Sequence, residues 1–193
     1  MNTTIARVVG SSSHSPGERE ENDYYATDPQ ALRNFLDASK DDLELTNNVW
    51  EPACGEGNLS RVLIEREHYV LSTDLVDRGY GVCMDFLTGD HWAWNGDILT
   101  NPPYKLAQKF IEKSLEMIKR RRYAIFLLRI QFLEGQKRKK FFEEYPPKFV
   151  YVHSARIGIW KNNDQEKYSG NALCFAWFVW EKGYNGDTIT RWI

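Results

Sequence analysis

The chain has 193 residues, of which 42% are hydrophobic and 14% aromatic, so its composition excludes a disordered protein and fits one sizeable core. No apolar run reaches about 18 residues, which argues against a membrane-spanning helix. The formal net charge is −2, so any contact with nucleic acid must come from local basic patches. The three cysteines and four histidines are too scattered for a disulfide framework or a metal site, and we expect a cytoplasmic protein without a metal.

Residues 1–22 are polar and rich in Ser, Gly and Glu, and they lack the apolar core of a signal peptide. We interpret them as a mobile tail, followed by a single domain at residues 23–193. Within that domain, helical and strand patterns alternate. The predicted order is helix 28–38, strand 48–51, helix 58–67, strands 69–73, 80–83 and 97–100, helix 105–119, strand 123–128, helix 136–145, and strands 149–153 and 173–180. This alternation predicts an α/β fold with a mostly parallel sheet and helices on both faces.

The segment 51–57, Glu-Pro-Ala-Cys-Gly-Glu-Gly, joins a predicted strand to a predicted helix. Gly55 and Gly57 permit a tight turn whose amides approach a ligand, and the following helix points its positive end there. A plain turn would also explain these glycines. Asp74 ends the next strand about twenty residues later, where an acid can accept both ribose hydroxyls of a nucleoside.

A further acid, Asp85, comes one predicted strand later and is followed by Phe86. Its carboxylate can accept a hydrogen bond from an adenine amine, with the phenyl ring against the base. A single surface Asp would not by itself indicate a binding site. Acids in this order at successive strand ends favour nucleoside binding.

The strongest signal is Thr-Asn-Pro-Pro-Tyr at residues 100–104, directly after a predicted strand. Two prolines fix the backbone, and we expect them to leave two carbonyls without competing amide donors. Asn101 offers another acceptor, and Tyr104 a flat aromatic face. A planar amine requires acceptors for its two hydrogens and a surface on which its ring stacks, and this segment supplies both.

In these segments the chain resembles amino-group DNA methyltransferases, most of all the small phage-type adenine methyltransferases. The resemblance extends over residues 23–193. It implies a Rossmann-like class I fold, with a seven-stranded, mostly parallel sheet and an antiparallel late strand. It also implies S-adenosylmethionine as methyl donor, adenine-containing DNA as partner, and transfer to the 6-amino group of a flipped-out base.

The family's functional residues carry over to particular positions. The catalytic residues would be Asn101, Pro102, Pro103 and Tyr104. The cofactor-binding residues would be Tyr25, Thr27, Glu51, Pro52, Ala53, Cys54, Gly55, Gly57, Asp74, Leu75, Asp85 and Phe86. The first two belong to residues 24–29, which approximate an N-terminal element near the cofactor's methionine end, although Asp28 intervenes before the proline. Direct transfer needs no covalent nucleophile, so Cys54 is interpreted as a small buried residue of the cofactor loop.

Only about forty residues separate Gly57 from Asn101, which is too few for a target-recognition domain, and we expect none after the last strand. Substrate contacts are therefore expected from loops. Lys137 and Arg138 follow a strand at the edge where ligands bind in open sheets, although a plain polar helix face would also explain them. Residues 156–160 and 161–172 resemble the family's late strand and target loop. Trp160 can stack on a base there, although a core position would also explain it. Arg129 and Gln131 are expected at the mouth of the pocket.

Three other functions fit the same residues. Asn-Pro-Pro-Tyr also serves methylation of other amides or amines, such as a protein glutamine or an RNA base. Methylation of the cytosine 4-amino group usually places Ser or Asp where Asn101 stands. A catalytically silent nucleic-acid binder is the non-enzyme alternative, and it would be expected to lose Asn101 or the cofactor glycines.

Overall fold

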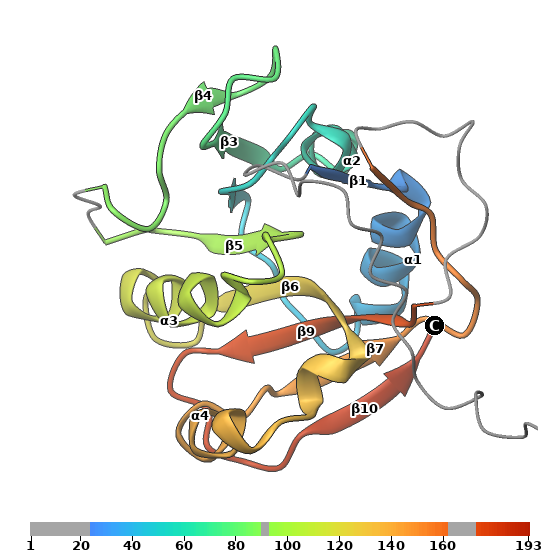
Figure 1. The fold of residues 1–193 in the computed structure, drawn as a ribbon, viewed down its shortest axis with the longest axis vertical. Coiled ribbons are helices and arrows are strands. Elements are labelled where there is room, and N and C mark those ends of the chain that lie inside the picture. Colours follow the sequence, from blue (N-terminus) through green and yellow to red (C-terminus); the bar gives the residue numbers. More distant parts are fainter. Residues whose placement is uncertain (1–23, 90–92, 162–172) are drawn as a thin grey trace, which may run out of the picture.

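A computed structural model of the protein describes residues 24–89, 93–161 and 173–193 (Figure 1). The predicted tail at 1–22 and nearly all of the expected target loop at 161–172 lie outside these residues. No helix within the described ranges is long and apolar enough to cross a membrane.

Every helix and strand predicted from the sequence is present, with ends shifted by a few residues. The helices are α1 (Pro29–Ser39), α2 (Asn58–Glu65), α3 (Ala107–Met117) and α4 (Lys139–Glu144), with short 3-10 turns η1 (Ile130–Leu133) and η2 (Gln136–Arg138). The strands are β1 (Tyr25–Thr27), β2 (Asn48–Glu51), β3 (Tyr69–Asp74), β4 (Val82–Cys83), β5 (Asp97–Thr100), β6 (Tyr123–Arg129), β7 (Phe149–Val152), β8 (Ile159–Lys161), β9 (Phe175–Glu181) and β10 (Ile189–Trp192).

Local chemistry explains where α1 begins. Asp28 is the N-cap, and its carboxylate accepts a hydrogen bond of 2.9 Å from the amide of Gln30. Pro29 occupies the first helical position, where a missing amide hydrogen costs nothing. Leu32 and Phe35 then lie on one face and are fully buried, which fixes the helix against the sheet.

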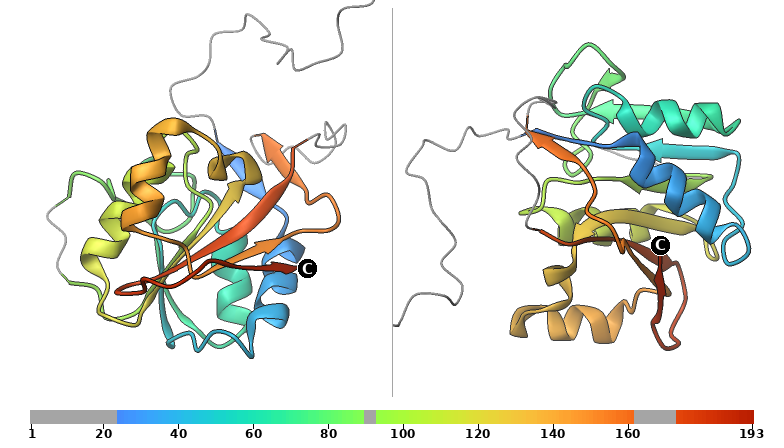
Figure 2. Two further views of the ribbon diagram at one scale, coloured as in Figure 1. Left: turned by 90° about the horizontal axis from the view of Figure 1, so that it is seen from below. Right: turned by 90° about the vertical axis from the view of Figure 1, so that its right-hand side faces the viewer.

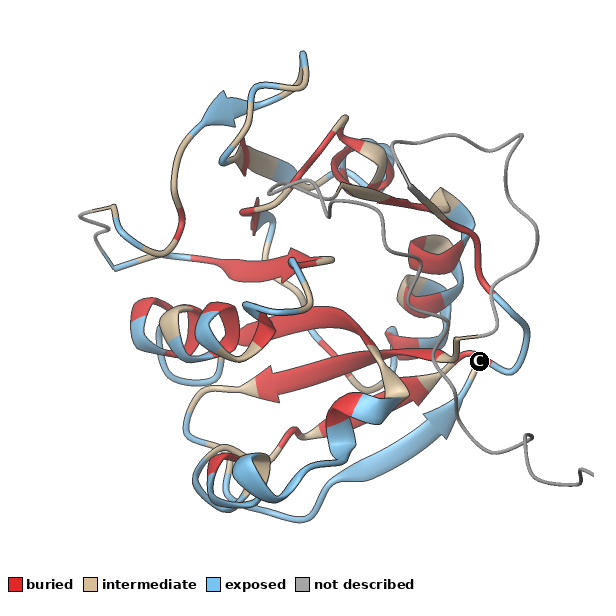
Figure 3. Cartoon of the chain, in the orientation of Figure 1, coloured by how far each residue is buried: buried red, intermediate tan, exposed pale blue. Residues whose placement is uncertain are grey.

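The main sheet has the strand order β10-β7-β9-β6-β5-β2-β3-β4. All neighbours are parallel except β9, which runs antiparallel between β6 and β7. The predicted antiparallel late strand is therefore confirmed, but the predicted number of seven strands was wrong, since β10 adds an eighth. Its four residues are all exposed at the sheet edge, so no buried pattern marked it in the sequence (Figure 3).

Two hydrophobic clusters lie on opposite faces of the sheet. Figure 2 shows the helices that cover these two faces. The first cluster joins α1 and α2 to one face, and the second joins α3 and α4 to the other. Strand β6 supplies alternate residues to the two clusters, with Ile125 and Leu127 on one side and Phe126 and Leu128 on the other. This three-layer packing explains why β6 is apolar throughout.

The chain reverses its direction across the sheet at β2. It first adds β3 and β4 on one side of β2, and then returns to add β5 and β6 on the other. In open α/β sheets, ligands bind outside the carboxyl ends of the strands at such a reversal. The segments after β2 and β5, residues 51–57 and 101–104, meet at this point.

A separate two-stranded ribbon stands beside this edge, and the sequence did not predict its pairing. β1 and β8 are antiparallel, with Ala26 opposite Trp160. Each has only three residues, and more than a hundred residues separate them in the chain. The ribbon brings the N-terminal segment next to the carboxyl ends of the main strands.

Candidate active site

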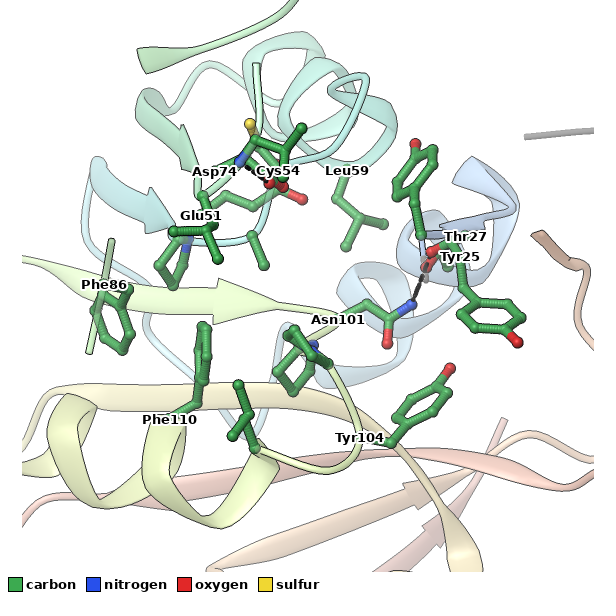
Figure 4. A pocket seen from close by; sticks show the side chains of 18 of the residues that line it. Tyr25, Thr27, Glu51, Cys54, Leu59, Asp74, Phe86, Asn101, Tyr104 and Phe110 are labelled. Atoms are coloured by element: carbon green, nitrogen blue, oxygen red, sulfur yellow. Dashed lines mark hydrogen bonds between the residues drawn. The ribbon is translucent and has the colours of Figure 1, made fainter. Parts of the chain in front are cut away.

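A cavity of about 620 Å³ lies at the carboxyl ends of β2, β3 and β5, next to β1 (Figure 4). All four predicted catalytic residues line it, and so do all predicted cofactor residues except Gly55 and Gly57, which shape the turn behind it. Arg129 lines it too, whereas Gln131 does not. Further lining residues that the sequence analysis missed include Asn58, Leu59, Met84 and Phe110. They carry no distinctive chemistry, and only the folded chain brings them together.

The turn at residues 51–57 requires glycine at two positions. Gly55 has φ of +54° and Gly57 has φ of +81°, a region that favours glycine. A Cβ on Gly55 would overlap the ring of Tyr24, and one on Gly57 would overlap the ring of Tyr80. The Tyr24 hydroxyl also accepts a hydrogen bond of 3.1 Å from the amide of Glu56. Two tyrosines thus pack directly on the backbone of this turn.

Asp74 connects the turn to the end of β3. Its Oδ2 accepts a hydrogen bond of 2.8 Å from the amide of Gly55, and its Oδ1 accepts one of 3.0 Å from the amide of Val76. Each carboxylate oxygen can accept a further bond, and the side chain lines the cavity. This position suits an acceptor for hydroxyl groups of a bound sugar.

Two titratable groups of this turn, the Glu51 carboxyl and the Cys54 thiol, are held in their neutral forms. Burial raises the pKa of the Glu51 carboxyl to about 8, although a hydrogen bond from the Ser60 hydroxyl opposes this. Burial also raises the pKa of the Cys54 thiol to about 12, with the nearby carboxyls of Glu51 and Asp74 acting in the same direction. A thiol with this pKa stays protonated at neutral pH, which suits a small packing residue and not a nucleophile.

Asp85 lines the cavity as expected, and its carboxylate also supports a turn. Its Oδ1 accepts a hydrogen bond of 2.8 Å from the amide of Leu87, and its Oδ2 accepts one of 2.6 Å from the Thr88 hydroxyl. The carboxylate therefore shapes the turn after β4 while lining the cavity. Phe86 beside it is buried, and its ring lies 4.9 Å from that of Phe110. This end of the cavity presents aromatic surface.

Asn101 is oriented by β1. Its Nδ2 donates a hydrogen bond of 2.9 Å to the Thr27 hydroxyl and a longer one of 3.3 Å to the carbonyl oxygen of Tyr25 (Figure 4). These bonds identify which end of the amide is nitrogen and direct Oδ1 away from β1. This oxygen is buried and has no hydrogen-bond partner among the described residues. The corner after β5 therefore contains a fixed acceptor that is unused.

The two prolines differ in the state of their carbonyls. Pro103 accepts a hydrogen bond of 2.8 Å from the amide of Leu106, so its carbonyl is not available, contrary to the expectation that both would be. Pro102 is buried, and its carbonyl accepts no hydrogen bond from the residues that the structure describes. The available acceptors of the corner are thus Asn101 Oδ1 and the Pro102 carbonyl.

Tyr104 lies beside these acceptors among other rings. Its centroid is 6.2 Å from that of Tyr25 and 6.0 Å from that of Phe175, and the Arg129 guanidinium carbon lies 4.8 Å above the ring. Burial raises the pKa of the Tyr104 hydroxyl, and the Arg129 charge and the Asn101 side chain nearby act in the opposite direction. No residue that the structure describes lies at normal hydrogen-bond geometry to this hydroxyl. Tyr104 is therefore a neutral aromatic wall of the cavity.

The three residues expected to contact a substrate do not line the cavity. Lys137 is exposed. Arg138 lies 4.5 Å over the ring of Phe132 and donates a hydrogen bond of 2.7 Å to the carbonyl of Glu134, so its guanidinium supports its own loop. Trp160 is half-buried in the β1–β8 ribbon. Any contact they make with a substrate must lie outside the cavity.

No protein-family model matches the sequence, and no curated protein matches it either. Solved structures do match the fold. One is a proposed class I S-adenosylmethionine-dependent methyltransferase from Listeria monocytogenes, with 13% identity and a TM-score of 0.56 over 83% of this chain and 63% of that one. A second is the modification subunit of a proposed type I restriction enzyme from Vibrio vulnificus, with 14% identity and a TM-score of 0.60 over 86% of this chain and 45% of that one. A third is a proposed RNA methyltransferase from Pyrococcus horikoshii, with 13% identity and a TM-score of 0.56 over 80% of this chain and 82% of that one.

The chain thus spans less than two thirds of the Listeria and Vibrio proteins. The same fold also occurs in two proteins described as proposed hemolysins, so the fold by itself names no substrate. What the matched methyltransferases and this chain share, at 13–14% identity, is the fold. The protein therefore has the Rossmann-like fold of class I S-adenosylmethionine-dependent methyltransferases.

Proposed function

We propose that the protein transfers a methyl group from S-adenosylmethionine to the 6-amino group of adenine in DNA. The observation that carries this proposal is the unused Asn101 Oδ1, fixed by β1 and buried at the wall of a cavity of about 620 Å³. A buried acceptor without a donor is unfavourable by itself, so a ligand with N–H groups is expected to complete it. An exocyclic amine of a base is such a ligand.

The cavity has the parts needed to bind the cofactor. Asp74 offers carboxylate oxygens for ribose hydroxyls, and the turn at residues 51–57 presents backbone next to the N-terminus of α2. Phe86 and Phe110 supply aromatic surface for an adenine ring, and the Asp85 carboxylate beside them can accept a further hydrogen bond besides those of its turn. S-adenosylmethionine, when bound, supplies an electrophilic methyl group.

The Asn-Pro-Pro-Tyr corner then assists the transfer through electrostatics. As the amine forms its new bond, its lone pair leaves conjugation with the ring and positive charge develops on nitrogen. Asn101 Oδ1 and the Pro102 carbonyl stabilise that charge, and they need no reorganisation because their positions are already fixed. Tyr104 supplies a surface for the flipped-out base, and binding both reactants in one cavity supplies proximity.

We propose DNA as the substrate, and not RNA or protein, for two reasons. The Glu-Pro-Ala-Cys-Gly and Asn-Pro-Pro-Tyr sequences resemble those of adenine enzymes acting on DNA. The fold also resembles that of the Vibrio modification subunit, which belongs to a proposed restriction enzyme. The likeness to the Pyrococcus protein makes an RNA base the second candidate.

The proposal is tested by offering duplex DNA, single-stranded DNA, RNA and protein extract with S-adenosylmethionine labelled in its methyl group. We expect label in DNA, and 6-methyladenine as the labelled nucleoside after digestion. The Asn101→Ala variant is the control, and it should bind the cofactor normally but transfer little label. Label confined to RNA or protein, or label in DNA that appears equally with Asn101→Ala, would overturn the proposal.

A further inference from the structure

Arg129 lies in the cavity at a place that the cofactor does not explain. It is the last residue of β6, the strand that pairs with β5, so it emerges beside the Asn-Pro-Pro-Tyr corner. Its guanidinium lies over Tyr104, on the side of the cavity assigned to the substrate. A cation at this position faces whatever binds on Tyr104.

This cation has no anionic partner among the residues that the structure describes. Arg129 forms no ion pair there, and its Nε is buried without a hydrogen-bond partner. Within the described ranges, its guanidinium carbon lies 4.8 Å from the centre of the Tyr104 ring, over the ring face. Arginine stays charged at all ordinary pH values, and a half-buried charge is stabilised when it gains an anion.

The geometry favours one kind of anion. An arginine that stacks on an aromatic ring still presents its N–H edge, and that edge suits bidentate binding of a phosphate. In a nucleic-acid strand, each base is joined through its sugar to a flanking phosphate. A base on Tyr104 therefore brings a phosphate into the neighbourhood of Arg129, whereas a glutamine side chain on a protein brings none.

We propose that Arg129 binds a backbone phosphate adjacent to the methylated base, so that the site recognises a nucleotide within a nucleic-acid strand. This inference rests on the proposed function and adds a residue that distinguishes a nucleic-acid substrate from a protein amide. Tyr104 and Arg129 then act together, the ring on the base and the guanidinium on the phosphate.

The test combines a variant with a modified substrate. An oligonucleotide that the parent protein methylates is prepared in three forms, unmodified and with a neutral methylphosphonate on the 5′ or the 3′ side of the target adenine. For the parent, one of the two neutral linkages should lower kcat/KM by about 10- to 100-fold, the range for losing a charge-assisted hydrogen bond. Arg129→Gln should lower kcat/KM on the unmodified strand by a similar factor. On the strand with that neutral linkage, kcat/KM of Arg129→Gln should fall by less than about twofold further.

Two further variants separate phosphate binding from support of the Tyr104 ring. Arg129→Lys retains the charge without the planar guanidinium, and it should restore part of the sensitivity to the neutral linkage. Lys119→Gln removes an equal charge from an exposed residue that precedes β6, at its opposite end, and should behave as the parent. The slope of log KM for DNA against log salt should fall by about one for Arg129→Gln but not for Lys119→Gln.

The possible failures are distinguishable. If the parent methylates nucleic acid, but the effects of Arg129→Gln and of the neutral linkages simply multiply, Arg129 does not bind the phosphate and the inference alone falls. If the parent labels protein and no nucleic acid, the proposed function falls together with it.

Discussion

Thr27→Val removes the shorter of the two bonds that orient Asn101, with almost no change in side-chain shape. Thr27 is 3% exposed, and its hydroxyl accepts the 2.9 Å bond from Asn101 Nδ2. Without it, the 3.3 Å bond to the Tyr25 carbonyl is the remaining bond from the amide nitrogen to a residue that the structure describes. A neutral hydrogen bond contributes about 1 kcal/mol, which corresponds to about a fivefold change in the fraction of correctly oriented amide. We therefore expect kcat to fall by about 5- to 10-fold, well below the loss of about 100- to 1000-fold expected for Asn101→Ala.

The assay is steady-state methyl transfer by the parent, the two single variants and the double variant. Because Thr27 acts through Asn101 in this account, Thr27→Val should change kcat by less than about twofold when Asn101 is already Ala. Calorimetry on the same proteins measures whether cofactor affinity is retained. Equal effects of Thr27→Val in both backgrounds, or a loss confined to cofactor binding, would contradict the assigned role of Thr27.

Three further predictions concern the cofactor end of the cavity. Asp74→Ala should weaken cofactor binding by about 1–3 kcal/mol, because a charged acceptor is lost. Asp77→Ala, on the exposed turn nearby, should leave the affinity unchanged. Unchanged affinity of Asp74→Ala on calorimetric titration would reject the role of Asp74. Gly55→Ala should weaken cofactor binding at least tenfold, because the added Cβ overlaps the ring of Tyr24. Gly79→Ala is the control for backbone strain alone, since Gly79 has φ of +75° but an added Cβ there would have no atom within 4 Å. The Glu51 carboxyl has an ordinary pKa of 4.5, and burial raises its pKa to about 8 in the folded protein. Between these two pH values the folded chain keeps a proton that the unfolded chain releases. The free energy of unfolding should therefore fall by up to about 1.4 kcal/mol for each pH unit that the pH rises. Urea unfolding over that range should show this slope in the parent and not in Glu51→Gln.

Sequence patterns predicted the parts of the fold that bury apolar residues periodically. The run of β6 and the spacing of Leu32 and Phe35 in α1 are examples, since burial forces those patterns. β10 could not be found in this way, because all of its residues are exposed. The pairing of β1 with β8 could not be predicted either, because each strand has three residues and is stabilised by a partner that is distant in the chain.

The residues of the site were easier to predict than their relationships. The turn at residues 51–57 and the Asn-Pro-Pro-Tyr corner each carry distinctive local chemistry, and the fold brings them to one cavity. The bond from Asn101 to Thr27 joins residues 74 positions apart, so no local pattern announces it. The same is true of Arg129 over Tyr104, whereas the turn formed by Asp85 might have been foreseen from the tendency of Asp to accept bonds from nearby amides.

The most direct test of the central claim is a crystal structure of the protein with S-adenosylhomocysteine and a methylatable oligonucleotide. We predict a flipped-out adenine against Tyr104, with its amino nitrogen about 3 Å from Asn101 Oδ1. Thr27 should still accept a hydrogen bond from Asn101 Nδ2 in that complex. An adenine bound elsewhere, or an Asn101 amide with its nitrogen toward the base, would contradict the account.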